Sequence, residues 1–279
     1  MSTFYEALSI NHLLLWALLA GLAASVVGGI VGSYVVVKRI AFISGSISHS
    51  VLAGIGLFLY LQRAHGILWL SPLAGALIAS VISAIVIGTI HSRYRAREDS
   101  AIAAIWSIGM AIGVLFLSLT PGFSVELANF LIGNILWVSE SDLYTLLILD
   151  ALVVITVVLF HEKLLAICFD EDEARLQGIK VGPLYLMLLT LIAITVVLLM
   201  QVVGIILVMT MLALPATIAN LYTKRLSSMM ALAVLISALL CLVGTFAAFH
   251  LNLPVGATIA LLAGVAYLAS LATGMRVKK

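Results

Sequence analysis

The chain has 279 residues, of which 64% are apolar and only 9% are charged. A soluble domain carries about 25% charged residues, so this composition excludes an ordinary soluble protein. At about 20 residues for each helical span, the apolar residues are enough for about nine transmembrane helices. Long unbroken apolar runs exclude a transmembrane β-barrel, whose strands are short and alternating. We therefore predict an all-α, polytopic membrane helical bundle with a single domain over residues 1–279.

The first half of the chain contains four uncharged segments that are each long enough for one crossing. Charged side chains are unfavourable in hydrocarbon, so runs without Asp, Glu, Lys or Arg mark the spans. The four runs are residues 13–37, 40–62, 64–92 and 100–125. The next run, 127–139, has only 13 residues. It is too short for an ordinary span, and we predict a short re-entrant helix there.

The second half contains one single span and two double spans. Residues 143–161 cross once. Residues 181–223 are uncharged for 43 residues, which is enough for two crossings with a break near 201–204. Residues 226–275 run for 50 residues and form two crossings that break at Asn252-Leu-Pro254. The total is nine crossings plus the short helix.

The basic residues orient these spans. With the N-terminus outside, 13 of the 14 Lys and Arg residues fall in inner loops, and only Arg63 falls outside. Loops on the cytoplasmic side carry an excess of Lys and Arg. We therefore predict an outer N-terminus and a cytoplasmic C-terminus. The largest inner loop contains DEDEARLQG over residues 170–178, which is typical of a short helix with acids at its start and Gly178 at its end.

His49 lies in the most polar part of any span. The stretch 44–54 reads SGSISHSVLAG, with serines at positions 44, 46, 48 and 50. Polar groups at membrane depth face protein or water, and imidazole is a common ligand of transition metals. We predict a substrate pathway that includes Ser46, Ser48 and His49, with His49 as metal ligand. The alternative, a structural histidine bonded to a neighbouring helix, is equally compatible with these residues.

Asp150 is the one carboxylate inside a predicted span. It is either part of the pathway, as a relay, or paired within the bundle. Sequence motifs for catalysis are missing: a phosphate-binding loop needs Gly-Lys, which does not occur, and HEKLL at 161–165 lacks the second histidine of a zinc protease. We therefore predict that the chain is not an enzyme and that any ATPase is a separate chain.

Five motifs together resemble the membrane permease subunits of ATP-binding-cassette importers for zinc, manganese and iron. The similarity extends along almost the whole chain and follows the order of the family's motifs. The matching stretches are RIAFISGSISHSVLAG (39–54), FLIGNIL (130–136), EARLQGI (173–179), VGIILV with LPATIA (203–208 and 214–219) and LPVGATI (253–259).

This resemblance implies a permease of the bacterial inner membrane that works by alternating access. It implies an ATP-binding subunit that hydrolyses ATP, an external metal-binding protein and a second permease chain, identical or not. This chain would bind no cofactor. The implied contacts with the ATP-binding subunit lie in the segment 215–225, where we expect Pro215 to interrupt a helix, and in the loop 173–178. The residues concerned are Pro215, Ala216, Thr217, Lys224 and Arg225, and Glu173, Ala174 and Gly178.

Three positions depart from the family pattern. Gly45, Asn134 and Asn252 are neutral where the family often has Asp. Neutral groups weaken attraction for a cation, which leaves His49 as the best remaining ligand candidate. Two alternatives stay open: an importer for iron–siderophore or cobalamin, and a secondary transporter driven by a proton gradient with Asp150 as relay.

Overall fold

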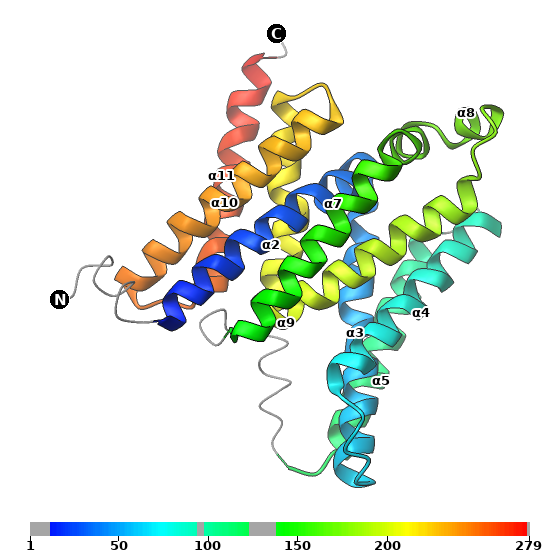
Figure 1. Cartoon of the computed structure of the whole chain (residues 1–279), viewed down its shortest axis with the longest axis vertical. Helices are drawn as coiled ribbons and strands as arrows, with labels where there is room; N and C mark the ends of the chain where they lie inside the picture. The colour runs from blue at the N-terminus through cyan, green and yellow to red at the C-terminus, as the bar shows by residue number, and fades with distance from the viewer. Residues whose placement is uncertain (1–11, 94–97, 123–137, 278–279) are drawn as a thin grey trace. The chain divides into compact units, whose positions relative to one another are not determined.

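The computed structural model describes residues 12–93, 98–122 and 138–277, and every regular element among them is a helix (Figure 1). The six-residue α8 is too short to cross a membrane, and the other eight helices are long and apolar enough to do so. The elements are α2 (His12–Val37), α3 (Ala41–Ala64), α4 (Pro72–Arg93), α5 (Glu98–Leu119), α7 (Glu140–Phe169), α8 (Glu171–Leu176), α9 (Val181–Tyr222), α10 (Leu226–Leu251) and α11 (Val255–Val277). The predicted all-α membrane bundle is confirmed. The predicted short helix at 127–139 lies almost wholly outside the described residues.

The chain divides into two compact units. Unit 1 comprises Met1–Arg39, Ala128–Leu159 and Leu198–Lys279, and unit 2 comprises Ile40–Leu127 and Phe160–Val197. Helices α7 and α9 each run through both units.

Helix α9 is broken by a glycine. It has 42 residues, and an unbroken helix of that number at 1.5 Å per residue would be about 63 Å long, roughly twice the hydrocarbon thickness. Gly204 has φ 79° and ψ 164°, which is a backbone conformation essentially limited to glycine. The break predicted at 201–204 is confirmed. The two arms, 181–203 and 205–222, are each about as long as one span.

Pro215 does not interrupt α9, and that prediction is wrong. The helix continues past Pro215 to Tyr222. Proline leaves the carbonyl four residues earlier without its usual donor, but membrane helices tolerate this where neighbours pack closely. Here Gly28 and Gly32 of α2 lie directly against the backbone of Met211 and Leu212. The helix therefore continues through the proline where it packs closely against α2 in unit 1.

The turn between α10 and α11 confirms the predicted break at 252–254. Asn252 has φ 52°, a left-handed conformation that asparagine tolerates better than most residues. The Leu253 N–H donates to the Ala248 carbonyl at 3.0 Å and closes the end of α10. The left-handed turn therefore gives a structural reason for asparagine at position 252, where the family often has an acid.

In unit 2, helix α3 packs against α4 and α5 through small residues. The backbones of Gly54 and Gly75 meet directly between α3 and α4. Gly109 and Gly113 of α5 lie against Ser50 and Leu52 of α3 in the same way. A Cβ at any of these glycines would collide with the neighbouring helix, so the small residues allow the close contact.

We expect Gly204→Ala to lower the free energy of unfolding by about 1–3 kcal/mol, because alanine is strained at this backbone conformation. Thermal unfolding in detergent, followed by circular dichroism, measures the effect. Gly264→Ala is the matched control, since this glycine lies inside α11 with no atom near its missing Cβ. Equal effects of the two substitutions would contradict the assignment of the break to Gly204.

Candidate functional site

His49 stacks on an aromatic side chain of the neighbouring helix. Its ring lies 4.4 Å from that of Trp106 of α5, centroid to centroid, at an angle of 14° between the planes. Its Nδ1 atom is buried and has no hydrogen-bond partner in the part of the chain that the structure describes. Most buried polar atoms have a partner. In the tautomer protonated at Nε2, this nitrogen presents a lone pair that suits a cation.

The hydroxyl groups around His49 are engaged in packing. Ser46 donates to the carbonyl of Ile102 in α5 at 2.9 Å. The hydroxyl group of Ser50 in α3 shares a hydrogen bond of 2.8 Å with that of Ser83 in α4. Ser48 donates at 2.8 Å to the carbonyl of Ser44 within α3. The bonds of Ser46 and Ser50 link α3 to α5 and α4, whereas the bond of Ser48 lies within α3. A pathway role for Ser46 and Ser48 stays a prediction.

Asp150 lies in the part of α7 that belongs to unit 1. Its carboxyl group approaches the backbone of Val27 in α2. The Oδ1 atom is buried and, within the described residues, has no hydrogen-bond partner. An unpartnered buried carboxylate oxygen is unfavourable, and a proton or a cation would satisfy it. His49, in contrast, belongs to unit 2.

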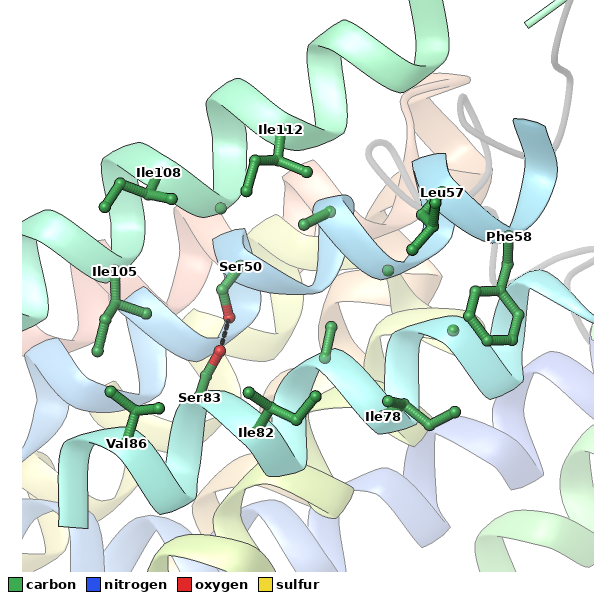
Figure 2. Close-up of a pocket in the computed structure, with 15 residues that line it drawn as sticks. Ser50, Leu57, Phe58, Ile78, Ile82, Ser83, Val86, Ile105, Ile108 and Ile112 are labelled. Atoms are coloured by element: carbon green, nitrogen blue, oxygen red, sulfur yellow. Dashed lines mark hydrogen bonds between the residues drawn. The ribbon is translucent and has the colours of Figure 1, made fainter. Parts of the chain in front are cut away.

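A cavity of about 330 Å³ lies between α3, α4 and α5 (Figure 2). Its lining is apolar apart from Ser50 and Ser83, which bond to each other. The labelled apolar side chains that point into it are Leu57, Phe58, Ile78, Ile82, Val86, Ile105, Ile108 and Ile112. A bare divalent cation needs nitrogen or oxygen ligands, so this cavity does not suit one. His49 is not among its lining residues.

The carboxylate of Asp142 accepts hydrogen bonds at the start of α7 and from α9. Its Oδ2 accepts from the Ser139 hydroxyl at 2.6 Å and from the Ser139 N–H at 3.0 Å. Its Oδ1 accepts from the Gln201 amide at 3.0 Å, three residues before the break at Gly204. The spacing Ser139-x-x-Asp142 is a readable helix-start signal. The pairing with Gln201, 59 residues away, has no signal in the sequence.

The residues expected to contact an ATP-binding subunit lie in two places. In unit 2, Asp170 caps α8 by accepting from the Glu173 N–H, and Gly178 follows with φ 78°, as predicted. Ala174 is buried within this short helix.

In unit 1, Pro215, Ala216 and Thr217 lie inside α9, with Ala216 buried. Lys224 and Arg225 follow in the turn to α10. Contact of these residues with an ATP-binding subunit stays a prediction.

Among the described residues, no group of three or more His, Cys, Asp or Glu side chains is arranged to hold a metal ion. Gly45 is buried in α3, and Asn134 lies outside the described residues.

Comparison with known proteins decides the family. A family model described as the ABC 3 transport family matches residues 11–274. The chain belongs to the ABC 3 transport family. The resemblance drawn from the five motifs is thereby confirmed, and the chain is a multi-pass transport permease of the ATP-binding-cassette type.

Two named transport proteins and one solved structure are similar to this chain over nearly their full length. A probable metal transport system membrane protein from Chlamydia pneumoniae is 49% identical over 265 residues, covering 95% of this chain and 90% of the relative. The manganese import system permease protein ScaB from Streptococcus parasanguinis is 32% identical over 270 residues, 97% of this chain and 94% of ScaB. The solved structure of PsaBC from Streptococcus pneumoniae, in complex with Fab, matches with a TM-score of 0.83 and 30% identity, over 96% of this chain and 94% of that one.

We expect Asp142→Ala to lower the free energy of unfolding by about 1–2 kcal/mol, because Ser139 loses its capping partner and Gln201 its acceptor. Thermal unfolding in detergent measures the change. Glu140→Ala removes a neighbouring exposed acid and serves as control, with an expected effect below about 0.5 kcal/mol. A loss of stability in the control as large as in Asp142→Ala would contradict the capping role.

Proposed function

We propose that this chain is the permease subunit of an importer that moves a divalent transition-metal ion across the bacterial inner membrane. The observation that carries the proposal is the match to the ABC 3 transport family over residues 11–274. Two similar proteins bear names that specify metal transport, and one of them specifies manganese. Manganese is therefore the first cargo to test, ahead of zinc and iron.

In this proposal, His49 contributes one ligand to a transient metal site. The support is its buried Nδ1 without a partner among the described residues, in a stretch whose hydroxyl groups are otherwise engaged. A site in a transport pathway has to release its ion, so a single protein nitrogen with a few further ligands suits the task. A second permease chain, identical or not, would supply some of these ligands. Asp150 is the candidate for a second position along the pathway.

The energy source in this proposal is a separate ATP-binding subunit. The sequence contains no Gly-Lys dipeptide, so the motif for a phosphate-binding loop is missing. An external metal-binding protein would deliver the ion, and alternating access would carry it inward. The predicted orientation, with an outer N-terminus, places Lys224 and Arg225 and the helix α8 on the cytoplasmic side with the ATP-binding subunit.

Two alternative functions can be distinguished from the proposed metal importer by simple uptake measurements. An importer for iron–siderophore or cobalamin would require a chelator for uptake, whereas the proposed importer takes the free metal from its binding protein. A proton-coupled transporter would continue without any ATP-binding subunit and would stop when the gradient collapses. Co-purification from the native membrane, followed by elemental analysis, identifies the partner chains and the bound metal.

We expect His49→Ala to lower manganese uptake at least roughly tenfold, because a metal ligand is lost, while the complex still assembles. Uptake of ⁵⁴Mn into vesicles, together with size-exclusion chromatography of the complex, measures both. His65→Ala, an exposed histidine in the same unit, is the matched control and retains uptake. Unchanged uptake in His49→Ala would remove His49 from the pathway.

We expect the double substitution Lys224→Glu and Arg225→Glu to weaken binding of the ATP-binding subunit, because two positive charges in the α9–α10 turn become negative. Co-purification with that subunit at two salt concentrations measures the loss. Lys163→Glu in α7 is a matched charge reversal outside this turn. Equal retention of the ATP-binding subunit by the wild type and the double variant would contradict this contact.

A further inference from the structure

His91 connects three helices of unit 2. Its Nε2 atom lies 3.0 Å from Oε1 of Glu171, the first residue of α8, and the two side chains are only 16% and 14% exposed. Its ring also stacks on Tyr185 of α9, with 4.1 Å between the centroids and 30° between the planes. One side chain near the end of α4 therefore contacts both the short helix α8 and the first arm of α9.

Helix α8 depends on such contacts for its position. It has six residues, and isolated helices of fewer than about 12 residues are marginal in water. Arg175 lies 3.8 Å from Glu171 and from Asp172, but these pairs lie within α8 and do not fix it to a neighbour. In Figure 1, α8 follows the last turn of α7 and leads into α9. The contact between His91 and Glu171 ties it to α4.

The same helix α4 is joined to α3 at two further points. Ser83 of α4 shares its hydrogen bond with Ser50 of α3, next to His49. One turn further along α3, the backbone of Gly54 meets that of Gly75 without an intervening side chain. Helices in such close contact move together more readily than they slide. Direct contacts thus run from α8 through α4 to the part of α3 that carries His49.

We propose that His91 is a positioning residue that couples α8 to the transmembrane helices. A displacement of α8 by the ATP-binding subunit is passed to α4 by the contact between His91 and Glu171, and to α3 by Ser83 and Ser50. The inference rests on the proposed function, because it assigns the displacement of α8 to an ATP-binding subunit. It adds the residue contact that transmits the movement.

The test measures metal transported for each ATP hydrolysed by the whole complex in proteoliposomes, with the external binding protein present. We expect this ratio to fall roughly tenfold in His91→Ala, within the range of a single coupling contact. The ATP-binding subunit remains bound. His91→Gln retains a hydrogen-bond donor for Glu171, so it restores part of the ratio and provides a second variant if His91→Ala folds poorly. The double variant of His91→Ala and Glu171→Ala lowers the transport ratio no further than His91→Ala alone. Each substitution removes the same contact between His91 and Glu171.

Thr89→Ala is the matched control. Thr89 lies two residues before His91 on α4, is exposed, and bonds only to the carbonyl of Ile85 in the described part of the chain. We expect wild-type transport per ATP in this variant.

The outcomes separate the inference from the proposed function. Wild-type transport with an unchanged ratio in His91→Ala overturns the coupling role and leaves the proposed function intact. Loss of the ATP-binding subunit from both His91 variants assigns the contact to docking and also overturns the coupling role. A wild-type complex that transports no metal overturns the proposed function, and this inference with it.

Discussion

The exclusion of water from the hydrocarbon layer is the constraint on which the rest of the structure depends. Every polar group inside a span has to find its partner in the protein itself. In α3, Ser46 bonds to α5 and Ser50 bonds to α4, so the polar residues that mark this span also hold it between its neighbours. Within the part of the chain that the structure describes, Nδ1 of His49 and Oδ1 of Asp150 are buried without a hydrogen-bond partner, which is unfavourable for a polar group.

The spans and their breaks were predictable because their signals are local. Charge-free runs mark the membrane segments, Gly204 permits a backbone conformation closed to other residues, and Asp170 caps the helix that follows it. Pro215 shows where local signals fail. Proline disfavours a helix interior, yet α9 continues through Pro215 beside Gly28 and Gly32 of α2. Contacts between such distant segments are not readable from one sequence.

The candidate site was predictable in part for the same reason. His49 is conspicuous in the sequence, since a histidine among serines is unusual in an apolar span. Its stack with Trp106, the bond from Gln201 to Asp142 and the contact of His91 with Glu171 join residues 57, 59 and 80 positions apart in the sequence. Only the fold brings these pairs together. The neutral residues Gly45 and Asn252 differ in their structural setting. Gly45 is buried in α3, and Asn252 closes α10 in a left-handed conformation.

The central claim is that this chain carries a metal ion with energy from a separate ATP-binding subunit. The most direct measurement is ⁵⁴Mn uptake into proteoliposomes that contain the complete complex and the external binding protein, with ATP inside or absent, and with or without a proton gradient. An importer driven by a separate ATP-binding subunit takes up manganese only when ATP is present, and this uptake is unaffected when the gradient is collapsed. Uptake that persists without ATP and stops when the gradient collapses would contradict it.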